Sequence, residues 1–436
     1  MKNEQTKVTR MLAVFFDGTG NNQINSLTNP TKFGNVTNIS KLLDACVIPD
    51  RIYIEGIGTQ NNKDDSDWAK ATGENPFSAT GYSYQNKLTK ATSFLDAYRA
   101  KYPDDDVELV IYGFSRGATL ARDFAKKALV FSNVRVKFLG IYDTVVSLFF
   151  QKPNIHFTSE EMSKVDQILH LTAIHEARYY FPLTSIFVEN KTSELVTIQN
   201  RREGFKIKEI FVPGAHADVG GGYTISPENL YLNASTASNE SLLADWQTIQ
   251  TNVKDHFENN VQAAIWKELL GSNVAIEGVN SKAKLLTRRA NVSIDMTAVY
   301  FEVMASYSNT SANFTIFDFT PKAFTADLAK LKSDLLHYIQ LGSPDKGPNY
   351  DYAKLAYTTH ISSNYGKIDN AQSVNERLNT FDVEGLKEEI ERIKAQHPTE
   401  NFESFNLDVL GYGGEMALVE VNKPNTKEWH RQIIYG

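Results

Sequence analysis

The hydrophobic and polar positions in the first half of the chain alternate between two kinds of pattern. Short apolar runs, typical of buried strands, occupy 11–16, 51–59, 104–113, 136–143 and 207–214. Between them, apolar residues at helical spacing predict helices over 84–98 and 118–129. Strands that alternate with helices across short connections form parallel sheets with helices on both faces. We therefore expect an α/β fold with a mostly parallel sheet.

The pattern changes after about residue 224. A long helical pattern covers 241–271, and a charged amphipathic helix is predicted at 382–396. No internal repeat, low-complexity tract or Pro-rich linker separates the two halves. We expect a sheet-bearing core at 1–230 and a helix-rich elaboration at 231–436. This elaboration would pack on the core, in the same domain or as a small second domain, as a cap or as a membrane or delivery region.

Composition narrows the classes of partner. The 436 residues are 42% hydrophobic and 22% charged, as in ordinary globular proteins. The formal net charge of −7 offers no basic footprint for a nucleic acid, so we expect none as a partner. The single cysteine, Cys46, excludes an intramolecular disulfide and fits a reducing compartment. Without a signal peptide or a membrane-spanning apolar run, we expect a chain made in the cytoplasm and secreted, if at all, by a signal-independent route.

A serine lies between two glycines where a predicted strand meets a predicted helix. Gly113, Ser115 and Gly117 match the pattern G-x-S-x-G. In a nucleophile elbow the serine occupies a strained turn, which requires neighbours without bulk, and the helix that follows stabilises developing negative charge. Ser115 is therefore the predicted nucleophile. The alternative is an idle serine in a glycine-rich turn.

A serine nucleophile needs a histidine base and an acid that orients the histidine. In α/β-hydrolases the chain order is serine, then the acid, then the histidine. Asp143 ends the next predicted strand, although an aspartate there could also cap a helix or form a turn. Of nine histidines, His216 alone follows a predicted strand within a glycine-flanked loop. His360 is the competing base, since this histidine often lies late in the chain. His175 falls in 169–181, read as a helix, where a packed histidine is expected.

The first predicted strand ends in a polar, glycine-rich loop that begins with Asp17. Backbone N–H groups of Gly18 and Thr19, together with that of Arg116, could form an oxyanion hole. A rival reading comes from aspartyl phosphatases, whose first strand ends in D-x-D-G-T. The second aspartate of that motif is missing here.

A metal site is a further alternative. Asp17, His216 and Asp218 offer oxygen and nitrogen ligands, but no H-x-x-x-H or H-E-x-x-H helix accompanies them. We therefore expect neither a metal nor a cofactor. Two roles stay open for Asp218: it hydrogen-bonds its own loop, or it competes with Asp143 for His216. The glycines at 220–222 would let the loop fold so that the imidazole reaches the serine.

Four segments together resemble a bacterial α/β-hydrolase family that includes the phospholipase effectors of type VI secretion systems and was long catalogued as a domain of unknown function. They are FFDGTGNN (15–22), GFSRGATLARDFA (113–125), LGIYDTV (139–145) and PGAHADVGGGY (213–223). Softer similarities lie at 54–59 and 173–182. The resemblance covers about 10–230. It implies that Ser115, Asp143 and His216 fall on the catalytic positions and that Asp17 shapes the oxyanion loop.

The resemblance also implies an activity. It points to a serine hydrolase that cleaves phospholipids or other lipid esters through an acyl-enzyme and serves as an antibacterial effector. Implied partners are the lipid substrate, peripheral contact with a membrane, an immunity protein and the secretion apparatus. The apolar run 145–151 would line the acyl site or touch a bilayer, or is simply buried. The alternatives are a housekeeping carboxylesterase or peptidase of the same fold, and a non-catalytic binding or scaffold protein.

Overall fold

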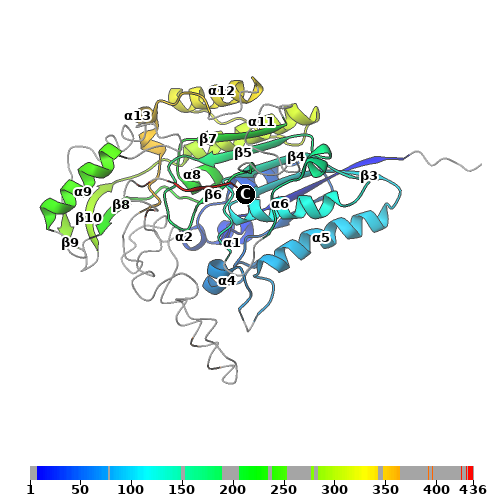
Figure 1. The fold of residues 1–436 in the computed structure, drawn as a ribbon, viewed down its shortest axis with the longest axis horizontal. Coiled ribbons are helices and arrows are strands. Elements are labelled where there is room, and N and C mark those ends of the chain that lie inside the picture. Colours follow the sequence, from blue (N-terminus) through cyan, green and yellow to red (C-terminus); the bar gives the residue numbers. More distant parts are fainter. Residues whose placement is uncertain are drawn as a thin grey trace, which may run out of the picture.

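The structure, a computed structural model, describes most of the chain (Figure 1). The described residues are 7–76, 79–148, 153–188, 206–233, 238–252, 276–278, 283–341, 347–363 and 431–435, with the single positions 391, 395, 424 and 429.

A parallel sheet of six strands forms the centre of the fold. Its strands are β1 (Thr9–Phe16), β2 (Arg51–Ile54), β3 (Asp106–Phe114), β4 (Val134–Tyr142), β5 (Ile168–Ala173) and β7 (Ile207–Val212). Their order across the sheet is β2-β1-β3-β4-β5-β7, and every neighbouring pair is parallel. The predicted α/β class is confirmed.

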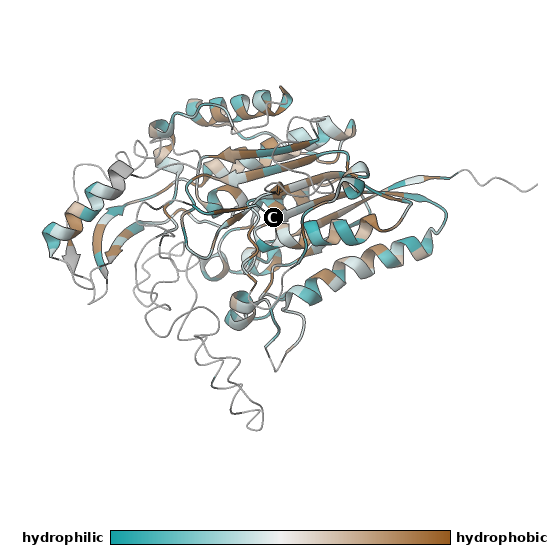
Figure 2. Cartoon of the chain, viewed as in Figure 1, coloured by the Kyte–Doolittle hydropathy of each residue, from teal (hydrophilic) through white to brown (hydrophobic). Residues whose placement is uncertain are grey.

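Helices cover both faces of this sheet, so its strands are buried on both sides and appear as continuous apolar runs. In β1, Leu12, Val14 and Phe16 pack in the hydrophobic cluster that contains α5 (Tyr84–Lys101) and α6 (Arg116–Leu129). Ala13 and Phe15, which point the other way, pack with α3 (Asn38–Ala45) and α11 (Asp295–Ala312). Figure 2 shows the hydrophobic strands between these helices.

Shorter elements surround this centre. The helices are α1 (Gln23–Thr28), α2 (Pro30–Phe33), α4 (Asp67–Thr72), α7 (Ser159–Ser163), α8 (His216–Gly220), α9 (Asn239–Asn252), α12 (Ala326–Gln340), α13 (Tyr352–Leu355) and the 3-10 helix η2 (Ala356–Thr358). Two small sheets are formed by β8 (Glu228–Asn233), β10 (Ala283–Arg289) and β9 (Glu277–Gly278), and by β11 (Ile433–Ile434) with β6 (Leu183–Thr184).

The second half of the chain contributes directly to the central core. Met296, Val303 and Met304 of α11 are fully buried in the cluster on one face of the sheet. The antiparallel sheet β8-β10-β9 was not predicted from the pattern. Of the helix expected at 241–271, α9 covers the beginning and positions 253–271 lie outside the described residues. The helix expected at 382–396 also lies outside them, apart from two positions.

The prediction of a helix over 169–181 is wrong. Positions 168–173 form strand β5, and all six of its residues are buried. A strand buried on both faces has no exposed side, so its sequence lacks the alternation that separates a strand from a helix. His175 follows the strand, and its Nδ1 accepts a hydrogen bond from Gly214 N at 2.8 Å. It is a packed histidine, as expected.

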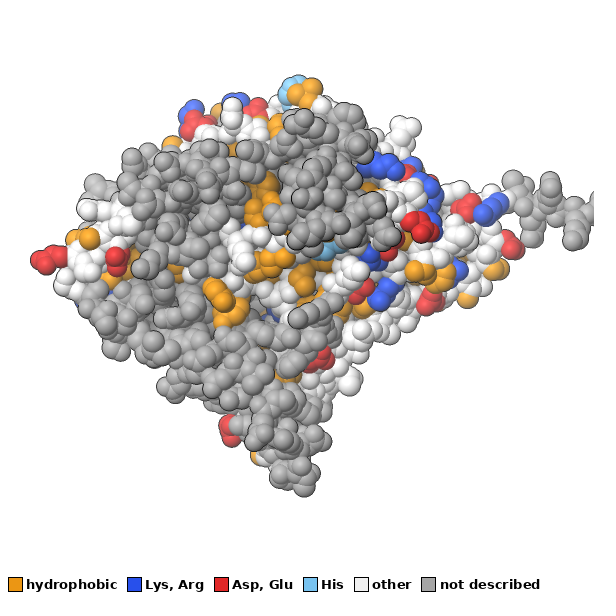
Figure 3. Space-filling model, in the orientation of Figure 1, with side chains coloured by type: hydrophobic (Ala, Val, Ile, Leu, Met, Phe, Trp, Pro, Cys, Tyr) orange, Lys and Arg blue, Asp and Glu red, His pale blue; other side chains and the backbone are white. Residues whose placement is uncertain are grey.

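On the face shown in Figure 3, Lys and Arg side chains are interspersed with Asp and Glu, and hydrophobic side chains lie between them. Within the described part of the chain, no helix is both long enough and apolar enough to span a membrane.

Candidate active site

The predicted site residues lie at the carboxyl edge of the sheet. The chain passes from β1 to β2 on one side and then to β3 on the other, so the carboxyl ends of β1 and β3 flank a topological switch point. Open α/β sheets bind their ligands at such points. The residues that follow β1, β3 and β4 are Asp17, Ser115 and Asp143, and His216 comes shortly after β7.

Ser115 occupies a strained turn between β3 and α6. Its φ of 58° and ψ of −128° are unfavourable for a residue with a side chain. The turn is packed tightly: a Cβ on Gly113 would lie 2.6 Å from Gly117 O, and one on Gly117 would lie 2.3 Å from Asp17 O. Both flanking glycines are therefore required by close backbone approach. This is the geometry of a nucleophile elbow.

His216 and Asp143 form a buried pair beside this turn. His216 Nδ1 lies 2.5 Å from Asp143 Oδ2. The imidazole ring packs 4.6 Å from the ring of Phe114, the residue before Ser115, and 5.1 Å from that of Phe181. The Ser115 N–H donates to Tyr142 O at 3.0 Å, which holds the serine next to the end of β4. Among the described residues, the hydrogen bonds of His216 include Asp143 but not Ser115.

The surroundings shift the pKa values of both members of this pair. Burial alone would raise the pKa of Asp143, but the Arg431 guanidinium and the hydrogen bond with His216 outweigh it and hold the pKa well below that of an ordinary carboxyl. Burial lowers the pKa of His216, against the opposing attraction of Asp143. The pair is therefore an ionised carboxylate beside a neutral imidazole at neutral pH, which suits a general base.

Arg431 is a contact of Asp143 that sequence reasoning missed. Its Nη1 and Nη2 donate to the two carboxylate oxygens of Asp143 at 2.5 Å and 2.9 Å. Both side chains are fully buried. No local pattern around position 431 indicates this role, since the partner lies in another part of the chain.

Asp218 and His360 form a second buried pair. Asp218 Oδ1 lies 2.5 Å from His360 Nδ1, and Oδ2 accepts from the backbone N–H of His360 and of Ala215. His360 also packs 4.3 Å from the ring of Tyr223. Asp218 thus hydrogen-bonds its own loop and His360, and the structure does not show it competing for His216. His360, the alternative base, has its own carboxylate partner and does not contact Asp143.

Asp17 anchors the loop after β1. Its buried carboxylate accepts hydrogen bonds from Tyr53 Oη at 2.6 Å, Thr37 Oγ1 at 2.7 Å, Gly18 N at 2.8 Å and Ser40 Oγ at 3.1 Å. Burial raises the pKa of Asp17, although these hydrogen bonds pull in the opposite direction. Asp17 therefore links the start of this loop to β2 and to the beginning of α3.

The contacts of this loop correct the expected oxyanion hole. Because the Gly18 N–H donates to Asp17, it is not available to an oxyanion in this structure. The other two expected donors, the backbone N–H groups of Thr19 and Arg116, stay predictions. Arg116 is the first residue of α6, where N–H groups have no partner within the helix.

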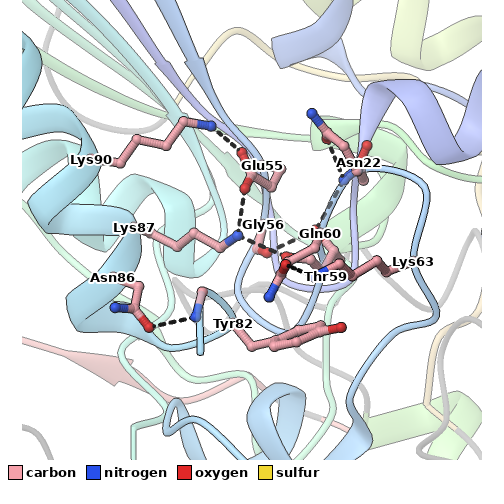
Figure 4. Close-up of polar contacts among 12 residues, drawn as sticks. Asn22, Glu55, Gly56, Thr59, Gln60, Lys63, Tyr82, Asn86, Lys87 and Lys90 are labelled. Carbon is pink, nitrogen blue, oxygen red and sulfur yellow. Dashed lines mark hydrogen bonds and ion pairs between the residues drawn. The ribbon is translucent and has the colours of Figure 1, made fainter. Parts of the chain in front are cut away.

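The loop that follows β2 and begins at Glu55 packs against the loop that follows β1 (Figure 4). A Cβ on Gly56 would lie 1.8 Å from Gly18 O, and Gly56 N donates to Asn21 O at 2.8 Å. Glu55 is held by Lys87 at 2.8 Å and Lys90 at 2.5 Å. Strand β2 ends at Ile54, earlier than predicted, at the point where its pairing with β1 also ends, with Phe16 opposite Ile54.

No group of three or more His, Cys, Asp or Glu side chains within the described residues is placed to hold a metal ion. Asp17, His216 and Asp218 belong to separate hydrogen-bond networks. In the apolar run 145–151, Val145 and Leu148 are buried, while 149–151 lie outside the described residues.

Comparison with known proteins bears on this site. The chain matches the family model for the catalytic domain of Tle1-like phospholipase effectors of the type VI secretion system (T6SS), over 10–129 and 123–245. The structure of a Tle1 effector bound to the VgrG spike of that system is 18% identical, with a TM-score of 0.52, over 82% of this chain and 85% of that one. An uncharacterised protein from Pseudomonas aeruginosa is 15% identical, with a TM-score of 0.38, over 97% of this chain and 65% of that one.

No curated protein matches the sequence. The resemblance recognised from four motifs is nevertheless confirmed, because the family match covers more than half of the chain. The solved Tle1 effector agrees with this fold. The chain belongs to the Tle1-like family of type VI secretion phospholipase effectors.

Proposed function

We propose that this chain is a serine-dependent phospholipid hydrolase that acts as an antibacterial effector, with Ser115, Asp143 and His216 as its catalytic residues. The observation that carries the proposal is the hydrogen bond between His216 and Asp143 beside the strained turn at Ser115. Membership of the phospholipase effector family supports the substrate class. The strained turn and the buried acid–base pair support the serine mechanism.

In the proposed reaction, these residues take the roles of a serine-hydrolase triad. His216 removes the proton from Ser115 Oγ as that oxygen attacks the ester carbonyl, and Asp143 stabilises the imidazolium that forms. The N–H groups of Arg116 and Thr19, with the N-terminus of α6, stabilise the oxyanion. The alcohol departs with the proton from His216, which leaves an acyl-serine. Water, deprotonated by His216, then releases the fatty acid and restores the serine.

Labelling with a fluorophosphonate probe tests the nucleophile. The wild-type chain should react with the probe and release fatty acid from phospholipid vesicles, and Ser115→Ala should do neither. Ser163→Ala, at an exposed serine in α7, is the matched control and should behave as wild type. Equal labelling of wild type and Ser115→Ala would disprove the serine mechanism.

Exposed apolar side chains adjoin the site loops and support a lipid substrate. Leu27 in α1 follows the oxyanion loop and is 69% exposed, while Ile225 follows the glycines at 220–222 and is 63% exposed. Such side chains favour peripheral contact with a bilayer. Leu27→Ser with Ile225→Ser should lower turnover of phospholipid vesicles several-fold and leave a short soluble ester unaffected. Better turnover of the soluble ester by wild type would favour a housekeeping esterase.

Partners follow from the related effector. The solved Tle1 effector is bound to a VgrG spike. By analogy we propose that a spike protein of the type VI apparatus carries this chain. Since the family resemblance implies it, we also propose that an immunity protein protects the producing cell. Co-purification of the full chain with a VgrG spike from the same genome tests delivery. Directing the wild type and Ser115→Ala to the periplasm of a sensitive bacterium tests whether toxicity needs the serine.

A further inference from the structure

The segment that contains Arg431 and β11 is remote in sequence from Asp143 but contacts it in the structure. Strand β11 pairs in parallel with β6, with Ile433 opposite Leu183 and Ile434 opposite Thr184 (Figure 1). Nearby Trp429 is buried in a hydrophobic cluster with Leu183. These contacts fix the segment that carries Arg431. The segment with Trp429, Arg431 and β11 lies outside the part of the chain that matches the catalytic-domain family, which ends at 245, whereas β6 lies within it.

Arg431 is held on all sides. Besides its two bonds to Asp143, it donates through Nη1 to Ala173 O at 3.0 Å and through Nε to Phe181 O at 3.1 Å. Asp143 Oδ1 also accepts from Ala173 N at 2.8 Å. The planar guanidinium thus contacts both oxygens of one carboxylate, an arrangement that fixes geometry as well as charge.

We propose that Arg431 is a positioning residue of the reaction: it fixes the plane of the Asp143 carboxylate and offsets its charge, and so sets the basicity of His216. This inference rests on the proposed function. His216 and Arg431 share Asp143 Oδ2, at 2.5 Å and 2.9 Å. The cation weakens the field of the carboxylate at the imidazole, so His216 stays neutral, and able to take a proton, to lower pH.

The other charged groups around His216 are themselves paired. Glu176 Oε2 lies 3.4 Å from His216 N, and Arg178 binds the same carboxylate at 2.9 Å. Asp218, on the helix that His216 begins, is bound by His360. Removing Arg431 would therefore leave the carboxylate of Asp143 as the uncompensated charge facing His216. A buried charge without its partner is costly, and protonation of His216 is one way to balance it.

Titration of His216 by NMR tests the inference without relying on turnover. The full chain would carry ¹³C-labelled histidine rings, with His216 assigned from His216→Gln. Arg431→Met should raise the pKa of His216 by about 1, the scale of a lost neighbouring charge. Arg431→Lys, which keeps the charge, should raise it less. Arg135→Met is the control for loss of an arginine charge, since Arg135 lies at the amino end of β4, away from Asp143, and pairs there with Asp166 at 2.8 Å. It should leave His216 unchanged.

The pH dependence of the enzyme kinetics provides a second test. The acid limb of kcat/KM for a soluble ester should move to higher pH in Arg431→Met by the same amount, so activity on that limb falls about tenfold. Guanidinium ions, which fit the space left in Arg431→Ala, should reverse part of the change. A purely structural role would lower the rate without moving the limb.

The outcomes separate the two proposals. An unchanged pKa of His216 in folded Arg431→Met would overturn the role of Arg431, even if Ser115-dependent hydrolysis is found. Absence of Ser115-dependent hydrolysis in wild type would overturn the proposed function. In that case the NMR titration still decides whether Arg431 controls His216.

Discussion

The described residues include two buried aspartate–histidine pairs with the same short contact. In each, the histidine Nδ1 lies 2.5 Å from a carboxylate oxygen, in Asp143–His216 and in Asp218–His360. The first pair lies beside Ser115, with Phe114 against its imidazole. The second pair packs against Tyr223, and His360 Nε2 is buried without a hydrogen-bond partner among the described residues.

A short Asp–His contact therefore does not by itself identify a catalytic base. Asp143 follows a strand of the central sheet and, besides His216, binds a cation, Arg431. Asp218 instead accepts two backbone N–H groups, from Ala215 and His360, and so fastens the loop to a later segment of the chain. We infer that the first pair serves chemistry and the second serves structure.

Replacing each histidine in turn should separate the two pairs most clearly. His216→Ala should lower kcat by roughly 10⁴-fold or more, because the serine loses its base. His360→Ala should keep activity within about tenfold of wild type. Fatty-acid release from phospholipid vesicles measures both. A larger loss in His360→Ala than in His216→Ala, with both proteins folded by circular dichroism, would reverse the assignment.

Replacing the two aspartates separates the pairs a second time. Asp143→Asn should lower kcat by about 10⁴-fold, because an amide neither stabilises the imidazolium nor selects the correct tautomer. Asp218→Asn only loosens the loop that bears His216, so we expect a loss below about 100-fold. Steady-state rates on a soluble ester provide the comparison. Similar losses in both variants would mean that the two carboxylates share one function.

His360 should contribute more to the stability of the fold than a histidine on the surface. His360→Ala removes a buried hydrogen bond to Asp218 and leaves that carboxylate short of a partner, so the free energy of unfolding should fall by about 2–4 kcal/mol. His337→Ala, at an exposed position in α12, should change it by less than about 0.5 kcal/mol. Denaturant titrations of the three proteins measure this. An equal, small effect in both variants would contradict a structural role for His360.

Much of the fold could be predicted because its information is local. The apolar runs that became β1, β3, β4 and β7 mark strands buried on both faces, and the glycines around Ser115 mark a tight turn. Strand β5 was misread for the same physical reason, since a fully buried strand carries no alternation to distinguish it from a helix.

The rest of the site depends on contacts that sequence spacing does not encode. Arg431 reaches Asp143, and His360 reaches Asp218, only because the later segments fold back over the sheet edge. The N–H of Gly18 turns toward Asp17 through a backbone conformation that the motif does not reveal. These are interactions between distant parts of the chain, and they required the structure.

The pH dependence of activity should distinguish the two pairs even where the rate changes little. Burial lowers the pKa of His216. In wild type, the apparent pKa of the acid limb of kcat/KM should therefore lie below about 6.5, the ordinary value for histidine. The sign follows because the active form is the neutral imidazole, which a depressed pKa preserves to lower pH. His360→Asn should leave the limb where it is, since His360 does not contact Asp143. A limb that moves in His360→Asn would show that the two pairs are electrostatically coupled through α8, and that the division between a chemical and a structural pair is too sharp.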